Sequence, residues 1–269
     1  MKPSFLKIDC HTHIVTEAMR EEYFSRTDGI AIVMPFLQRF VDFGFPDDSL
    51  HVVAGEKRLF LSPTIDIAAP LEPQLKKIET LLPYKVVGLK IFLTYQKGRA
   101  DEERLMPIYD FAEEHRLTLT YHTGSCALLL PSDNDMEGSN ARYIRNVALR
   151  YPKVNFVIAH MDDPRYDACV QLMHGVPNLF TDFCGCFEPG TKEDADRAWA
   201  TDTFGHALHQ FPDIYKQVLY GTDFCPPLNL SEIEAYETTM SALFPPEECA
   251  KIYYENALRA FPRLNDYLN

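Results

Sequence analysis

The feature that most constrains the fold is a pattern that repeats along the chain. A short apolar run rich in β-forming residues ends in polar residues, a helical stretch follows, and another such run begins. The eight runs cover residues 5–13, 30–34, 59–66, 86–92, 117–123, 156–161, 179–184 and 218–223. Segments with helical periodicity lie between most of them, at residues 72–82, 103–115, 141–151 and 164–173.

Strands that alternate with helices imply parallel strands joined by right-handed crossovers. Eight such units in 269 residues fit a closed (β/α)8 TIM barrel, typically about 250 residues long, better than an open sheet. Because no long Gly/Ser linker divides the chain, we expect an α/β fold in a single domain, residues 1–269. Two connections are unusually long: residues 36–58, which we expect to roof the site, and the polar residues 130–140, which suit a lid.

Charge and composition exclude several classes of protein. The formal net charge of −13 argues against nucleic acid or an anionic membrane as a partner. The chain has no apolar stretch of about 18 residues, and its start turns polar at Asp9, too early for a signal peptide. Seven cysteines without paired spacing indicate reduced thiols in a cytoplasmic protein. We expect a small-molecule substrate; the aromatic residues Tyr253, Tyr254 and Phe261 fit either packing or a homodimer interface.

The first run ends in a His-x-His pattern. Strand side chains alternate between faces, so His11 and His13 point the same way and their imidazoles can reach one ion. Asp9 shares that face one step deeper, where its carboxylate could accept a hydrogen bond from a ligating ring. On its own, a pair of histidines at this spacing is more often a surface accident than a metal site.

Later runs end in the same kinds of residue. His122 closes the fifth run, His160 the sixth and Asp223 the eighth. In a barrel, the carboxyl ends of all strands meet at one mouth, where active sites lie. Imidazoles and a carboxylate buried together are costly without compensation, so a divalent cation is the simplest explanation for the set.

The motifs that carry these residues resemble the amidohydrolase superfamily. The resemblance lies in Asp9–His13 (DCHTH), His122-Thr123-Gly124, Ala159-His160-Met161, Tyr220-Gly221-Thr222-Asp223 and Asn256-Ala257. It is greatest to the amidohydrolase-2 branch, which contains aminocarboxymuconate semialdehyde decarboxylase and related metal-dependent hydrolases. The resemblance implies a distorted (β/α)8 barrel and one divalent metal, usually zinc, with manganese, iron or cobalt as alternatives. It also implies that His11, His13, His122 and Asp223 are ligands, with His160 ligating or poised over the substrate.

Lys90 lies on the fourth run, where Val87, Leu89 and Ile91 are expected to form an apolar outer face. The lysine is therefore expected to point into the barrel, which is unusual for this residue type. An unmodified Lys90 would bind a substrate carboxylate or balance the charge of the site. Other branches of the superfamily carbamylate a lysine on this strand to bridge two metals, which leaves a second metal open as an alternative, and a structural role is the third.

Weaker candidates lie after the fifth and sixth strands and at the end of the seventh. Arg165, after the sixth strand, and Arg142, beside the polar loop, could meet an anionic substrate, although a solvated surface charge is the more common role for such residues. Asp182 on the seventh strand could support the metal ligands or be a hydrogen-bonded barrel acid. Cys184 and Cys186 look like a thiol ligand pair, but no second pair accompanies them.

The expected chemistry is hydrolysis of a C–N or C–O bond in an amide, lactone or ester. Zinc would lower the pKa of its water to about 7, Asp223 would act as general base, and His160 would stabilise the developing oxyanion. A nonoxidative metal-dependent decarboxylase of the same family is the alternative, since the ligands do not distinguish the two reactions. A non-catalytic metal-binding scaffold is a third possibility, but a scaffold has no physical need for these costly polar groups.

Overall fold

The structure is a computed structural model that describes residues 6–42, 44, 47–125, 134–182, 184–185, 194–225 and 233–268. In this part of the chain the strands are β1 (Ile8–Thr12), β2 (Ile30–Val33), β3 (Leu59–Leu61), β4 (Gly88–Phe92), β5 (Thr118–His122), β6 (Phe156–Ile158) and β7 (Leu179–Thr181). They form two parallel sheets, in the orders β1-β2-β3 and β4-β5-β6-β7.

Single parallel pairs join the two sheets into a ring. Leu61 pairs with Val86 between β3 and β4, and residues 218–224 connect β7 to β1 through the pairs Thr181–Val218 and Thr12–Phe224. The residues around these pairs also share backbone hydrogen bonds, among them Leu219 N to Thr181 O at 2.8 Å and Cys10 N to Tyr220 O at 2.9 Å. Residues 218–224 therefore take the place of the eighth strand without forming a regular one.

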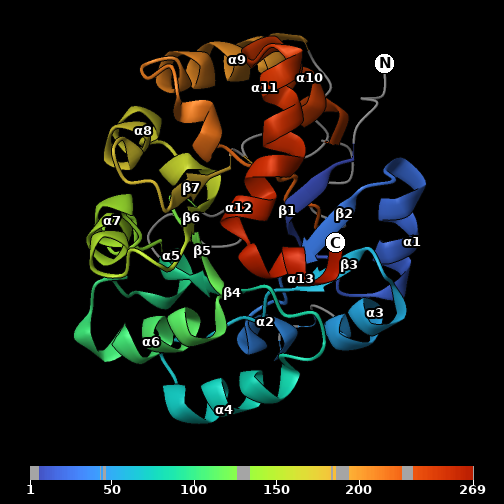
Figure 1. The fold of residues 1–269 in the computed structure, drawn as a ribbon, viewed down its shortest axis with the longest axis vertical. Helices are drawn as coiled ribbons and strands as arrows, with labels where there is room; N and C mark the ends of the chain where they lie inside the picture. Colours follow the sequence, from blue (N-terminus) through green and yellow to red (C-terminus); the bar gives the residue numbers. More distant parts are fainter. Residues whose placement is uncertain are drawn as a thin grey trace.

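Helices surround this ring. The longer ones are α1 (Glu17–Arg26), α3 (Ser49–Gly55), α4 (Leu71–Leu81), α6 (Met106–His115), α7 (Ala141–Arg150), α8 (Tyr166–Met173), α9 (Asp194–Leu208) and α10 (Ile233–Leu243). Figure 1 shows most of them as an outer layer around the central strands. The α/β barrel predicted from the alternating runs is confirmed. No helix in the described ranges is long and apolar enough to cross a membrane.

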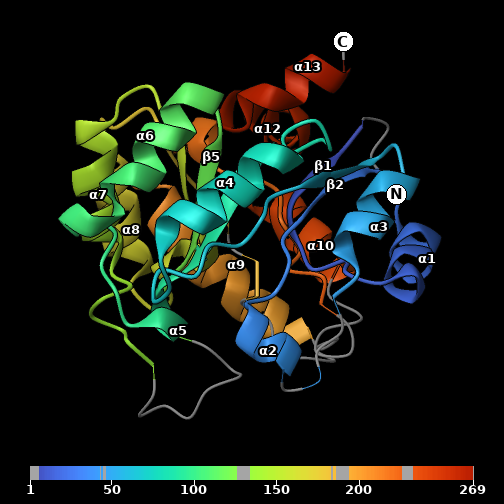
Figure 2. The same ribbon diagram turned by 90° about the horizontal axis from the view of Figure 1, so that it is seen from below.

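The remaining helices are shorter. They are α2 (Gln38–Asp42), α5 (Leu93–Gln96), α11 (Pro246–Ala250), α12 (Asn256–Ala260), α13 (Asn265–Leu268), the 3-10 turns Glu103–Leu105, Ala159–Asp162, Ile214–Gln217 and Pro262–Leu264, and the π-helical turn Lys251–Glu255. Figure 2 shows α2 and α5 at one end and α12 and α13 at the other. Because α5 directly follows β4, its end is the one where the strands terminate.

The core has an outer and an inner part. Apolar residues on the outer faces of the strands pack against the helices, and Leu89, Ile91 and Tyr121 belong to this part. The inner part fills the amino-terminal end of the ring, where strand residues such as Phe60 and Phe180 meet Phe261 of the C-terminal segment. This packing closes one end of the ring, which leaves the carboxyl-terminal end for polar groups.

The first residues of the long connection after β2 cover that carboxyl-terminal end, as predicted, whereas α3 of the same connection packs beside β3. The Phe36 ring stacks on His13, with centroids 4.9 Å apart, and Phe40 packs against Tyr95 of α5 at 5.1 Å. The predicted lid at residues 130–140 lies partly outside the described residues.

Candidate metal centre

His11 and His13 stand at the end of β1, and both are buried. The Nδ1 atom of His13 lies 2.7 Å from the carbonyl oxygen of Met34, so it carries the proton and leaves the Nε2 lone pair free. The Nδ1 atom of His11 lies 3.2 Å from Asp182 Oδ2, which likewise assigns its proton to Nδ1. Both rings therefore present an unprotonated Nε2 atom to the centre of the site.

Asp223 faces these two nitrogens. Its Oδ1 atom lies 3.4 Å from His11 Nε2 and 3.2 Å from His13 Nε2. The positive φ of 55° at Asp223 and the hydrogen bond from its backbone N–H to the His11 carbonyl oxygen, at 2.8 Å, turn the carboxylate toward the rings. The pKa of Asp223 is held well below its usual value because His11 and His13 outweigh the effect of burial.

The chemistry of these three donors fits a divalent metal. Two imidazole lone pairs and a carboxylate oxygen face one another, and their ligand atoms lie within 4.8 Å of one another. Acceptors that converge in this way repel one another unless a proton or a cation lies between them. Imidazole nitrogen and carboxylate oxygen are ligands that zinc accepts. The structure thus brings together three of the five side chains expected to share an ion.

Asp182 follows β7 and holds two histidines in place. Its Oδ2 atom accepts from His11 Nδ1, and its Oδ1 atom accepts from the backbone N–H of His160 at 2.9 Å. Burial alone would raise the pKa of Asp182, but the neighbouring His11 lowers it to about 2. A carboxylate that accepts from the far nitrogen of a ligating ring fixes its orientation and tautomer. This is the supporting role expected for Asp182.

His160 and His122 form a second pair beside the first. His160 lies in the turn after β6, where it has a φ of 63°, and the sixth strand ends at Ile158, three residues before the end of the predicted run. Its Nδ1 donates to the Cys184 carbonyl oxygen at 2.7 Å, and its Nε2 lies 3.0 Å from His122 Nδ1. Burial, and then the neighbouring His160, lower the pKa of His122 well below its usual value.

His160 and His122 differ in how they contact the first pair of histidines. The His160 ring centroid lies 5.2 Å from that of His11, and His160 forms a possible three-donor group with Cys184 and Asp223. Within the described ranges, His122 belongs to no three-donor group of this kind. Its contact with the site runs through His160.

Lys90 points into the barrel, as expected. Its side chain is fully buried, and its Nζ atom lies 2.9 Å from His11 Nε2. Burial lowers the pKa of Lys90 to about 8. The lysine is therefore part of the site.

The sequence did not predict that Cys184 is part of the site. Its buried Sγ atom donates to Asp182 Oδ1 at 2.9 Å and lies 3.0 Å from His11 Nδ1. The sequence offered only the Cys-Gly-Cys spacing as a signal, and Cys186 lies outside the described residues. The thiol contacts Asp182 and His11, two residues that are far apart in the sequence and meet only in the folded chain.

The predicted hydrogen bond from a ligating ring to Asp9 is wrong. The register of β1 shifts between Asp9 and Thr12, and the Nδ1 atoms of His11 and His13 face Asp182 and the Met34 carbonyl rather than Asp9. Asp9 instead accepts from the backbone N–H groups of His11 and Thr222 and from the hydroxyls of Tyr23 and Thr222. Burial raises the pKa of Asp9 to about 7. Its role is to tie β1 to residues 218–224.

Both candidate arginines already have acidic partners. Arg165 binds Asp162 through two nitrogens, at 2.9 and 2.5 Å, and is half-buried. This pair braces the turn that carries His160. Arg142 forms an ion pair with Glu137 and is half exposed. Neither contact requires an anionic ligand.

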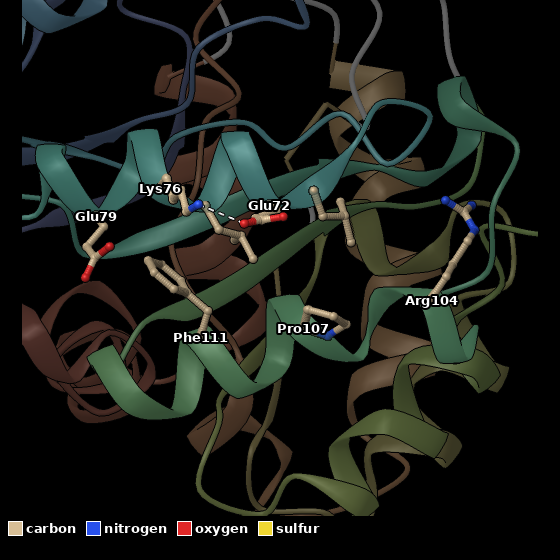
Figure 3. Close-up of a pocket in the computed structure, with 8 residues that line it drawn as sticks. Glu72, Lys76, Glu79, Arg104, Pro107 and Phe111 are labelled. Atoms are coloured by element: carbon tan, nitrogen blue, oxygen red, sulfur yellow. Dashed lines mark hydrogen bonds and ion pairs between the residues drawn. The ribbon is translucent and has the colours of Figure 1, made fainter.

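A separate groove of about 500 Å³ lies on the outside of the ring, between α4 and α6 (Figure 3). Its lining residues are Leu71, Glu72, Leu75, Lys76, Glu79, Arg104, Pro107 and Phe111. Glu72 and Lys76 pair across one turn of α4 at 2.7 Å. None of these residues belongs to the histidine site.

Gly185 allows a test of how tightly the site is packed. Its φ is +65°, and an added Cβ would lie 2.8 Å from Asp223 Oδ2 and 3.0 Å from His160 Nδ1. We expect Gly185→Ala to cost about 1–2 kcal/mol from left-handed strain and to lower kcat/KM roughly 10- to 100-fold by displacing these two groups. Urea unfolding and steady-state kinetics measure the two effects.

Gly175→Ala is the matched control. Gly175 has a φ of +77°, but an added Cβ would meet nothing within 4 Å. The control should show the same strain without the kinetic loss. Equal kinetic effects in both variants would show that Gly185 does not shape the site.

These features define a class of protein, an α/β barrel whose candidate metal donors gather at the carboxyl ends of its strands. The chain belongs to the amidohydrolase family, because the sequence model described as Amidohydrolase matches residues 51–263. The matched region contains His122, His160 and Asp223 and begins after His11 and His13. The resemblance seen in the sequence motifs is thereby confirmed.

Solved structures support the fold. An uncharacterised TIM-barrel protein from Bordetella bronchiseptica superposes with a TM-score of 0.70 at 17% identity, over 98% of this chain and 100% of the other. 4-Oxalomesaconate hydratase from Rhodopseudomonas palustris gives 0.63 at 15% identity, over 98% of both chains. 5-Carboxyvanillate decarboxylase from Sphingomonas paucimobilis gives 0.58 at 15% identity, over 96% and 99%. No curated protein matches the sequence.

Proposed function

We propose that the protein is a metal-dependent hydrolase that cleaves a C–N or C–O bond, in an amide, lactone or ester, of a small carboxylate-bearing molecule. The observation that supports it is the position of Asp223 Oδ1, 3.4 and 3.2 Å from the Nε2 atoms of His11 and His13. In this proposal these three residues hold one divalent metal, with His160 and His122 beside it. Zinc suits nitrogen and oxygen donors best, and manganese, iron or cobalt are alternatives.

The side chains have distinct roles in the proposed reaction. A divalent metal bound there supplies a Lewis acid that polarises a carbonyl group and makes water nucleophilic near neutral pH. Asp223 remains ionised, so its carboxylate can accept a proton from water and return it to the leaving group. The Nδ1 atom of His160 donates to the Cys184 carbonyl, and its Nε2 atom lies 3.0 Å from His122 Nδ1. To stabilise a substrate oxyanion, His160 would have to carry a proton on Nε2 as well and turn that N–H from His122 to the substrate.

The balance of buried charge supports a substrate that carries a carboxylate. Asp182 and Asp223 are negative, Lys90 is positive, and a divalent ion adds two positive charges. With a neutral water on the metal, one positive charge therefore remains among these groups, and a monoanionic substrate would neutralise it. We propose Lys90 as the partner of this carboxylate, because Arg165 and Arg142 are already paired with acids.

Nonoxidative decarboxylation is the second candidate. The buried cation of Lys90 could orient the carboxylate that is lost as well as one that is retained. Three of the similar structures are named as decarboxylases, one of 5-carboxyvanillate and two of 2,6-dihydroxybenzoate. Both reactions use the same metal donors, so only the products separate them.

An assay that measures product acid and CO2 together tests the proposal. Protein purified without chelator is first analysed for metal, then given a panel of lactones, amides, esters and unsaturated or aromatic carboxylates. We expect acid without CO2, loss of activity with chelator, and recovery with zinc or manganese. CO2 matched to substrate loss would identify a decarboxylase instead. Far less than one equivalent of metal, with no turnover after metal is added, would support a non-catalytic scaffold.

A further inference from the structure

Lys90 makes a contact that the proposed reaction does not explain. Its Nζ atom lies 2.9 Å from Nε2 of His11, and both side chains are fully buried. Lys90 reaches this position from the middle of β4, where it pairs in register with Thr120 of β5. A lysine that gives up its hydration in this way needs a strong acceptor.

His11 has only one lone pair to offer. Its Nδ1 carries the proton, since this nitrogen faces Asp182 Oδ2 at 3.2 Å. The lone pair is therefore on Nε2, and Lys90 Nζ donates a hydrogen bond to it. A metal bound by His11, His13 and Asp223 needs the same lone pair, because His11 Nε2 is the atom that faces Asp223 Oδ1.

Lys90 also supplies the charge that the metal would supply. The acids around it are Asp223 and Asp182, and both act on Lys90 as attractive charges. Without a metal, the ammonium group is the buried cation that offsets them. With a metal, the ammonium and the ion are like charges beside one imidazole, and each disfavours the other.

We propose that Lys90 is a resident competitor for the metal site: in the metal-free protein its ammonium group occupies the lone pair of His11, and the metal must displace it. The inference rests on the proposed metal donors His11, His13 and Asp223. Two consequences follow. Lys90 weakens metal affinity, and metal loading releases its N–H groups within a buried site, where a substrate carboxylate can accept from them.

The test compares zinc affinity in the wild type and in Lys90→Met, which removes the charge and the donor but keeps the length of the side chain. Zinc is titrated against a chromophoric chelator of known affinity. We expect zinc to bind Lys90→Met about tenfold or more tightly than the wild type. Lys153→Met, which removes an exposed lysine paired with Glu113, controls for net charge and should bind zinc like the wild type.

Thermal unfolding gives a second readout. Without metal, Lys90→Met leaves the two carboxylates uncompensated, so its melting temperature in chelator should fall below that of the wild type, while zinc should raise it by more. Lys90→Gln, which keeps a neutral donor, serves if Lys90→Met does not fold without metal. Equal or weaker zinc affinity in both Lys90 variants would overturn the inference.

One further variant separates this failure from failure of the proposed function. If His13→Ala binds zinc as tightly as the wild type, the proposed metal donors are wrong and the inference falls with them. If His13→Ala loses zinc while the Lys90 variants bind like the wild type, the metal site stands and only the role of Lys90 is refuted.

Discussion

Asp223→Asn should lower kcat by about 10²- to 10⁴-fold, the range typical of a lost general base. The amide has the size of the carboxylate but cannot accept a proton from water. Asn also tolerates the left-handed backbone that Asp223 adopts, with a φ of 55°, so the substitution should not disturb the turn. The measurement is steady-state kinetics on the substrate that the panel identifies, with protein of known zinc content.

The zinc content decides how a loss of rate is interpreted. Asp223 stands among the proposed metal donors, so the variant must be assayed at zinc concentrations that saturate it. Asp213→Asn, at an exposed acid paired with Lys216, is the control for charge and should keep full activity. A zinc-loaded Asp223→Asn protein that turns over at the wild-type rate would exclude Asp223 as the base.

The barrel was predictable because it depends on local patterns. Alternation along β5 correctly placed Tyr121 in the outer core and His122 at the site. Alternation along β4 likewise placed Leu89 outside and Lys90 inside, but it was wrong for Val87, which packs in the inner part of the core. Such patterns reflect burial on two faces of a strand, and burial is what the order of apolar and polar residues records.

The predictions failed where the backbone departs from regular geometry. The register of β1 shifts between Asp9 and Thr12, and the Asp9 carboxylate contacts Tyr23 and Thr222 instead of a histidine ring. Positive φ angles at His160 and Asp223 end the sixth and eighth runs as turns rather than as strands. All three departures lie at the candidate site, where local strain positions side chains that a regular strand would place elsewhere. Nothing in the order of residue types marks them.

Contacts between distant segments were equally hidden. Cys184 and His11 are far apart in sequence, and their contact at 3.0 Å exists only because β7 and residues 218–224 bring the end of β7 next to β1. The pairing of Arg165 with Asp162 also follows from the conformation of a turn, not from a motif. The residue types indicated which side chains could bind a metal or transfer a proton. Which of these side chains contact one another depends on the fold.

His13→Ala is the most direct way to empty the proposed metal site without unfolding the protein. His11 is less suitable, because its removal would leave Asp182 and Lys90 buried without their partner. His13 donates a hydrogen bond to the Met34 carbonyl, stacks on Phe36 and faces Asp223 Oδ1 at 3.2 Å. Its loss should therefore cost about 1–3 kcal/mol of stability in the metal-free protein.

The effect on metal binding should be far larger. Loss of a residue that merely orients a ligand typically costs about 10- to 100-fold in metal affinity, and loss of a ligand should exceed that. Zinc per chain after dialysis, together with chelator competition, measures it. His51→Ala, at a histidine whose side chain is 71% exposed, should retain zinc. If His13→Ala retains zinc as well, the donors His160, Cys184 and Asp223 become the alternative site, and Cys184→Ser should then release the metal.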